Sequence, residues 1–156
     1  MSAAPTGGPD AERPAYKPFR PVRARRVALG AAVLTVAALT FLAVILPREV
    51  SIWDRLGVVA FALIVAWFLL RHANVRAVPS PSGLLVRNLF HSRRLEWAEI
   101  IAVRLGGDSS WAQLDLSEGD TLPVMAIQRS DGAYAESEAR RLATLVAIGS
   151  RTERND

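Results

Sequence analysis

Two long stretches without a charged side chain constrain this chain more than any other feature. The first, Val27–Leu46, has 20 residues, and a helix of that length spans about 30 Å, the thickness of a bilayer's hydrocarbon core. The second, Leu56–Leu70, has 15 residues and is extended by Ile52 and Trp53, with Asp54 and Arg55 at headgroup level. The sequence therefore predicts two transmembrane helices, over residues 27–46 and 56–71.

Each run also has an alternative interpretation. An apolar run near the start of a chain can be the core of a signal peptide, but such cores have about 7–15 residues and end at a small-x-small cleavage site. The first run ends in LPRE, which is no such site, so we expect a retained helix. The second run is short enough to be a buried helix of a soluble domain, but it has no polar face, which favours a span.

The charges that flank the two runs predict their orientation. Arginines cluster before the first run in RPVRARR, and Arg71, His72 and Arg76 follow the second, whereas the loop 47–55 balances two arginines with two acids. Short basic flanks stay in the cytoplasm. We therefore expect a multi-pass protein of the cell membrane with both termini cytoplasmic and the loop 47–55 outside.

The remaining composition separates tails from a domain. The net charge of +4 resides entirely in residues 1–26, where six basic residues oppose two acids. A nucleic-acid-binding domain carries its own basic excess, so nucleic acid is not an expected partner. Residues 1–26 are rich in Pro, Gly and Ala and are expected to form a disordered basic cytoplasmic tail; residues 150–156 are expected to be a second disordered tail.

Residues 74–149 predict a small α+β domain. Short alternating runs separated by turn signals such as PSPSG, GGDSS and SEGD indicate about six antiparallel strands. After RSDGA the apolar spacing becomes helical. A small sheet cannot cover its own apolar face, so we expect a β-barrel or half-barrel closed by a C-terminal α-helix, preceded by the transmembrane hairpin.

This part of the chain resembles the bacterial pleckstrin-homology-like (PH-like) domains of small actinobacterial membrane proteins, the family of low-molecular-weight protein antigen 6. The resemblance is carried by the strand Gly83–Arg87, by the W-x-x-I element Trp97–Ile100, and by two apolar helices ahead of the domain. It implies a PH-like fold, a membrane location, and no established activity. The motif residues Gly83, Trp97 and Ile100 are expected in the core, with ligand stacking by Trp97 as the alternative.

The residue types present exclude several chemistries. The chain has no cysteine, and its two histidines, His72 and His91, are far apart, so no metal site is expected. It has neither a phosphate-binding glycine loop nor a nucleophile elbow. We therefore predict no catalytic residue, no cofactor, no small-molecule substrate and no enzyme activity. The first hairpin loop, PSPSG, lacks the basic residues with which many PH folds bind lipid phosphates.

Two functional hypotheses follow. In the first, the protein is a non-catalytic adaptor or accessory subunit that binds an unidentified membrane or cytoplasmic protein, with Trp111 on an outer face of the domain as its candidate contact. In the second, the domain senses the anionic lipid of the inner leaflet. The candidate residues for the lipid surface are Arg71, Arg76, Arg93 and Arg94.

Overall fold

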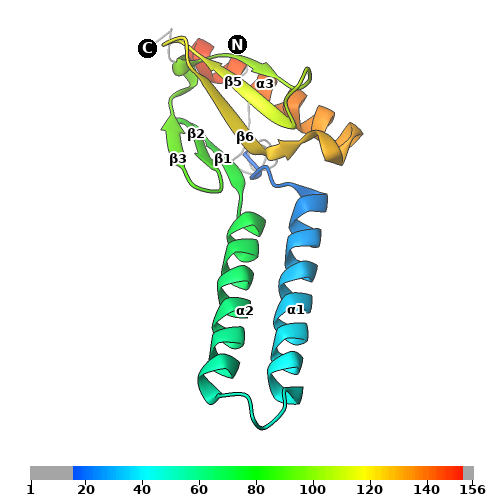
Figure 1. The fold of residues 1–156 in the computed structure, drawn as a ribbon. Helices are drawn as coiled ribbons and strands as arrows, with labels where there is room; N and C mark the ends of the chain where they lie inside the picture. The colour runs from blue at the N-terminus through cyan, green and yellow to red at the C-terminus, as the bar shows by residue number, and fades with distance from the viewer. Residues whose placement is uncertain (1–15, 153–156) are drawn as a thin grey trace, which may run out of the picture. The chain divides into compact units, whose positions relative to one another are not determined.

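The structure, a computed structural model, describes residues 16–152 of the 156. The chain folds into two compact units (Figure 1). One is a helical hairpin over Val22–Val75. The other is an α+β domain that contains residues 76–152 together with the described residues that precede the hairpin, 16–21.

The hairpin consists of α1 (Val22–Ile45) and α2 (Ile52–Ala73). The two helices face each other through small side chains, and the buried alanines are Ala28, Ala32 and Ala43 of α1 and Ala62, Ala66 and Ala73 of α2. Small residues allow two helix backbones to approach closely, which is how helices pack in lipid. Both helices are long enough and apolar enough to cross a membrane.

Both helices extend beyond the apolar runs that predicted them. Helix α1 begins at Val22 rather than at residue 27, because Pro21 suits the start of a helix and the arginines that follow are good helix formers. Helix α2 begins at Ile52 because the Ser51 hydroxyl accepts a hydrogen bond from the Trp53 backbone N–H. The connection between the helices is therefore shorter than the predicted loop 47–55.

Arg55 joins the two helices at this connection. Its guanidinium donates hydrogen bonds to the carbonyl oxygens of Ala43, Leu46 and Pro47, at 2.8, 2.7 and 2.7 Å. The last carbonyls of a helix have no partner within the helix, and a cation beside them also suits the negative end of the helix dipole. One side chain of α2 thus caps the end of α1.

The domain contains two antiparallel sheets of three strands (Figure 1). Sheet A has the order β1-β2-β3, and sheet B the order β4-β5-β6. The strand bounds are β1 Arg76–Ser80, β2 Gly83–Arg87, β3 Ser92–Leu95, β4 Ile100–Arg104, β5 Trp111–Leu116 and β6 Thr121–Gln128. The predicted six strands are confirmed; the sheets do not close on each other, so the domain is a half-barrel.

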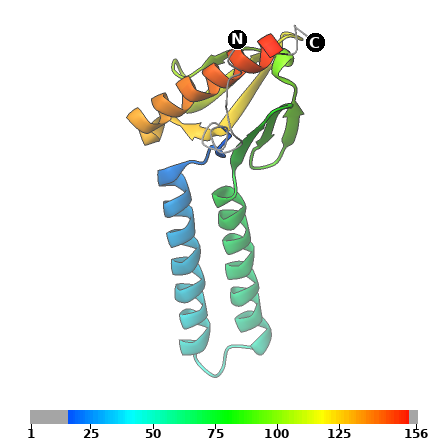
Figure 2. The same cartoon turned by 180° about the vertical axis from the view of Figure 1, so that it is seen from behind.

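Helix α3 (Ala133–Thr152) covers sheet B (Figure 2). Its buried side chains include Ala135, Leu142, Leu145 and Val146, and it packs on β4, β6 and the short helix η1 (Trp97–Glu99). The helix continues to Thr152. Residues 150–152, which the sequence assigned to a disordered tail, are therefore helical. Residues 153–156 lie outside the described residues.

Trp97 occupies the centre of the domain and is only 1% exposed. Its indole N–H donates to the carbonyl oxygens of Ser80 and Pro81 in the β1–β2 turn, at 3.1 and 3.2 Å. Gly149 of α3 lies directly over the indole, since a Cβ built at that position would be 2.3 Å from the Trp97 Cγ. The ring therefore connects sheet A, η1 and the C-terminal helix.

Asn88 links sheet A to sheet B. Its side-chain amide donates to the Pro123 carbonyl at 2.7 Å and accepts from the Met125 N–H at 3.1 Å. Strand β6 is the edge of sheet B at this point, and Pro123 has no N–H to offer. The Asn88 amide therefore satisfies backbone groups that no neighbouring strand of the described chain satisfies.

We predict that Gly149→Ala destabilises the domain by about 1–3 kcal/mol, the usual cost of overpacking a core. The clash with Trp97 outweighs the gain of about 1 kcal/mol in helix propensity. Thermal unfolding followed by near-ultraviolet circular dichroism measures the effect. Gly57→Ala in α2 is the matched control, because no atom lies within 4 Å of its added Cβ. An unchanged or raised melting temperature for Gly149→Ala contradicts this packing.

Candidate interaction surfaces

The segment that precedes α1 forms part of the domain. Phe19 pairs with Ala77 of β1 in an antiparallel bridge with two backbone hydrogen bonds, whose N···O distances are 2.8 and 3.1 Å. The Phe19 side chain is fully buried, and Pro21 is also among the most buried residues. The expectation of a disordered tail to residue 26 is therefore corrected from Tyr16 onward; residues 1–15 lie outside the described residues.

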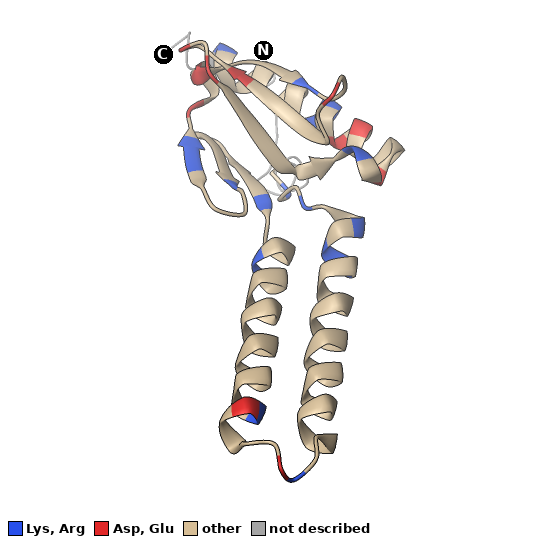
Figure 3. Cartoon of the chain, in the orientation of Figure 1, with Lys and Arg blue, Asp and Glu red and all other residues tan. Residues whose placement is uncertain are grey.

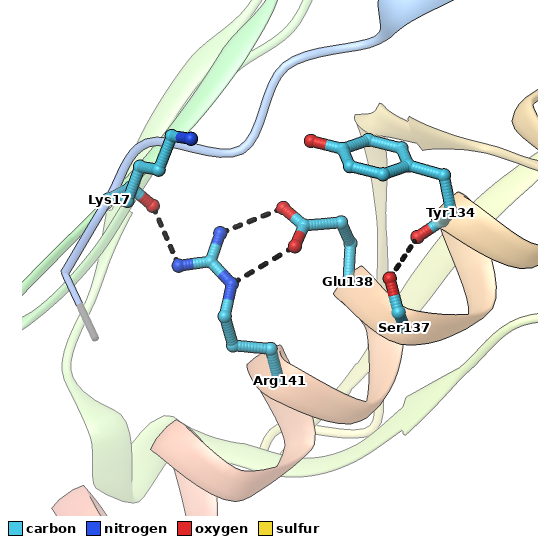
Figure 4. Close-up of polar contacts among 5 residues, drawn as sticks. All are labelled: Lys17, Tyr134, Ser137, Glu138 and Arg141. Atoms are coloured by element: carbon cyan, nitrogen blue, oxygen red, sulfur yellow. Dashed lines mark hydrogen bonds and ion pairs between the residues drawn. The ribbon is translucent and has the colours of Figure 1, made fainter. Parts of the chain in front are cut away.

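Arg141 of α3 holds this segment in place (Figure 4). Its guanidinium lies over the Phe19 ring, 3.8 Å from the ring centroid, and donates to the Lys17 carbonyl at 3.0 Å. Glu138 accepts two further hydrogen bonds from the same group, at 3.2 and 2.8 Å. This bidentate pairing with Glu138 fixes the plane of the Arg141 guanidinium. In that orientation the guanidinium can contact the Phe19 ring and donate to the Lys17 carbonyl at the same time.

Tyr134 stands one helical turn before Glu138 on the same helix (Figure 4). Partial burial raises the pKa of the Tyr134 phenol above its ordinary value, and the negative charge of Glu138 raises this pKa further. The phenol consequently stays neutral across the physiological range. It serves as a polar but uncharged neighbour of the Glu138–Arg141 pair.

The outer face of sheet A is basic. Strand register places Arg76 directly opposite Arg87, and Leu85 directly opposite Arg94. Residues that alternate along a strand share one face, so Arg76, Arg87 and Arg94 lie on the same side of the sheet. Figure 3 shows basic residues on all three strands of this sheet. The opposite side of the sheet carries the buried residues Ala77, Leu84, Val86 and Leu95.

The other two arginines of the predicted lipid surface are arranged differently. Arg93 alternates with Arg94 and points to the other side of β3, where its guanidinium lies 3.5 Å from the Glu118 carboxylate. Arg71 belongs to the last turn of α2, with its guanidinium 5.8 Å from the centre of the Trp67 ring. Arg93 and Arg94 both belong to strand β3, so their side chains alternate across the sheet.

The outer face of sheet B carries Trp111. Trp111, Gln113 and Asp115 alternate with the buried Ala112, Leu114 and Leu116, and Trp111 itself is half-buried. Arg104 of β4 forms an ion pair with Asp115 on this face. Ile101, the extra residue where the β4–β5 register shifts, is 67% exposed. The outward side of β5 thus combines an aromatic ring, an amide side chain and a carboxylate that is neutralised by Arg104.

The three motif residues lie in the interior. Trp97 and Ile100 are 1% and 4% exposed. Gly83 has a φ of 146°, and a Cβ there would lie 2.0 Å from the Leu95 carbonyl oxygen, so no other residue fits. Because Trp97 is enclosed by Gly149 and the β1–β2 turn, its ring offers no face on which a ligand can stack.

The described residues 16–152 contain no group of three or more His, Asp or Glu side chains that could hold a metal ion. The β1–β2 turn is Pro81-Ser82, and it carries no basic residue. The Ser80 hydroxyl instead donates to the Gly83 carbonyl at 3.0 Å, which stabilises the turn.

Comparison with known families agrees with the fold. Residues 74–144 match the family model of the bacterial PH domain, and two antiparallel sheets followed by a C-terminal helix are the fold that the sequence resemblance implied. Over these residues the chain is similar to bacterial PH domains, and the hairpin that precedes them has two helices that are long and apolar enough to span a membrane. The PH-domain family is generally non-catalytic.

Relatives with this similarity occur in mycobacteria. The chain is 36% identical to the uncharacterized protein Rv1417 of Mycobacterium tuberculosis and to the uncharacterized protein Mb1452 of Mycobacterium bovis, over 94 residues. The match covers 60% of this chain and 61% of each relative. No solved structure gives a significant match.

We predict that Phe19→Ala lowers the free energy of unfolding of the domain by about 3–5 kcal/mol, the usual cost of removing a buried phenylalanine ring. The same change should speed hydrogen exchange at the Ala77 amide, which donates to the Phe19 carbonyl. Denaturant unfolding and exchange of the full chain in detergent measure both effects.

Phe90→Ala is the matched control for Phe19→Ala, because Phe90 is 66% exposed. Truncation of an exposed side chain usually changes stability by less than about 0.5 kcal/mol. If the two variants lose equal stability, or if Ala77 exchange is unchanged in Phe19→Ala, the segment 16–21 is not an integral part of the domain.

Proposed function

We propose that this protein is a membrane-anchored, non-catalytic adaptor or accessory subunit. The helical hairpin anchors it in the cell membrane with both termini in the cytoplasm, and the PH domain binds a membrane or cytoplasmic protein there. The observation that carries the proposal is the outer face of sheet B, where half-buried Trp111 shares the outward side of β5 with Gln113 and with Asp115, which is ion-paired to Arg104.

The surface of the hairpin supports the membrane location. Large apolar side chains point outward along both helices; examples are Val33 at 72% exposed, Leu34 at 70%, Phe61 at 59% and Ile64 at 64%. A contiguous apolar surface of this length is unfavourable in water, where patches above a few hundred Å² are rare. In hydrocarbon the same surface carries no such penalty, while the helices satisfy their own backbone hydrogen bonds.

The distribution of charge supports the orientation. Figure 3 shows α1 and α2 without charged residues along most of their length. Basic residues occur at the start of α1 (Arg23, Arg25 and Arg26) and in the last turn of α2 (Arg71), whereas Arg48 and Arg55 at the hairpin turn are balanced by Glu49 and Asp54. Basic flanks are retained in the cytoplasm, and both belong to the end of the hairpin that adjoins the domain in sequence.

The chemistry of the sheet B face supports protein binding. Tryptophan is enriched among the residues that dominate protein–protein binding energy, and charged residues are depleted at the centre of such interfaces. On this face Arg104 and Asp115 form an ion pair, and their charges neutralise each other. The face therefore presents apolar and hydrogen-bonding groups without a net charge to desolvate.

The orientation is tested by cysteine labelling, which the cysteine-free chain makes specific. We expect a membrane-impermeant maleimide to label Glu49→Cys, in the hairpin connection, in intact cells. Ser137→Cys, on the exposed side of α3, should react only after permeabilisation. Both positions are exposed, so reactivity reports the side of the membrane. Labelling of Ser137→Cys in intact cells contradicts the proposed topology.

The adaptor role is tested by a photo-crosslinking residue at Gln113, which shares the sheet B face with Trp111. In native membranes we expect one discrete protein adduct at this position. Trp111→Ala in the same chain should lower the yield at least tenfold, as loss of a central binding residue does. Thr144, exposed on α3, is the control position. No adduct at Gln113, or equal adducts at both positions, overturns the proposed interface.

A further inference from the structure

Arg76, Arg87 and Arg94 lie together on the outer face of sheet A, although their positive charges repel one another. Arg76 and Arg87 are direct cross-strand partners, and Arg94 is paired with Leu85, two residues before Arg87 on the neighbouring strand. Like charges placed directly opposite each other destabilise a sheet. The arrangement therefore carries a cost within the isolated domain.

The acids of the domain do not offset this cost. Four other arginines of the domain, Arg93, Arg104, Arg140 and Arg141, each form an ion pair with a nearby carboxylate. Within the described residues 16–152, no carboxylate forms an ion pair with Arg76, Arg87 or Arg94. This face thus has donors and positive charge available for an external anion.

Chain connectivity limits where this face can lie. Arg76 begins β1 only three residues after Ala73, the last residue of α2. Three peptide steps span at most about 11 Å, so Arg76 stays within that distance of the helix end in any orientation of the domain. Arg71 and His72 lie in the last turn of the same helix. An inserted hairpin therefore keeps the start of sheet A near the headgroups.

We propose that the outer face of sheet A is a docking surface for anionic lipid headgroups of the membrane that holds the hairpin, with Arg76, Arg87 and Arg94 as its phosphate contacts. The inference rests on the membrane location proposed above, but not on the protein interface of sheet B. The docking site is the sheet face, not the β1–β2 turn, which has no cation.

Guanidinium groups suit this partner. Each presents several N–H donors in a plane that matches phosphate oxygens, and each arginine near an anionic surface shifts the docked population about fivefold. Three such residues on one rigid sheet act together on a single surface. The anion also supplies the counter-charge that Arg76 and Arg87 lack, so docking removes their mutual repulsion.

The test uses the full chain reconstituted in nanodiscs of two compositions, phosphatidylcholine alone or with about 30% anionic phosphatidylglycerol. A Ser92→Cys substitution carries an environment-sensitive fluorophore, because Ser92 is exposed on the same face and is the cross-strand partner of Arg87. We expect the emission to shift to the blue only in the anionic discs. The shift should decrease as salt rises from about 50 to 500 mM, where the screening length becomes shorter.

Two triple variants separate the face from total charge. Arg76→Gln/Arg87→Gln/Arg94→Gln should abolish the blue shift, whereas Arg129→Gln/Arg140→Gln/Arg151→Gln, which removes the same charge from exposed positions elsewhere in the domain, should retain it. Circular dichroism of each variant establishes whether it is folded. If the first triple variant is unfolded, Arg→Lys replacements at the same three positions take its place; because they keep the positive charge, they should retain at least part of the shift.

Equal emission in both kinds of disc, or equal loss in both triple variants, overturns the docking surface. If the shift is absent from the anionic discs although the chain is folded, an acidic protein segment becomes the expected partner of this face, and the lipid proposal is wrong. The adaptor proposal fails separately, through the crosslink at Gln113, and the membrane location fails separately, if the chain does not enter the discs.

Discussion

The buried indole of Trp97 is the contact on which the half-barrel depends. Two sheets of three strands that do not close leave one end of their shared interior open, and a small domain cannot leave that end to water. Trp97, in the short helix between β3 and β4, fills this end. Its indole N–H donates to the carbonyl oxygens of Ser80 and Pro81. Gly149, which has no side chain, lets α3 approach the face of the ring. Glycine is also required at position 83, where β2 begins, because a side chain there would collide with the Leu95 carbonyl oxygen. The core is thus specified by one large ring and two glycines that make room around it.

Much of this fold follows from local patterns in the sequence. The uncharged runs predict both helices of the hairpin, because apolarity on all sides over about 20 residues is typical of a helix that spans a membrane. Alternation within the segments from residue 84 to 128 predicts the strands, since one face of each has to be buried. The change to helical spacing after residue 133 predicts α3. The bounds are less accurate, because helix ends are set by caps such as Ser51 rather than by apolarity.

The contacts that the sequence does not predict are those between distant segments. Phe19 is a single aromatic residue in a stretch rich in Pro, Gly and Ala, and composition assigns such a stretch to disorder. Its burial depends on Ala77 and Arg141, which are far away along the chain. The arginines of sheet A are visible in the sequence, but the opposition of Arg76 and Arg87 depends on strand register. Arg93 and Arg94 are neighbours in sequence but face opposite sides of β3, because side chains alternate along a strand.

The outer faces of the two sheets differ in whether their arginines are neutralised by a carboxylate of the same chain. On sheet B, Arg104 is neutralised within the chain by Asp115, so the Trp111 face is available for contacts that exclude water without a net charge to desolvate. On sheet A, three arginines lack such a partner in the described chain, and two of them repel each other across the strands. A ligand that binds only the folded state stabilises it, so an anionic surface against sheet A would raise the stability of the domain as well as orient it. Folding and docking are then linked: the domain would be most stable where its hairpin places it, beside the anionic headgroups, and sheet B would remain available to a second partner.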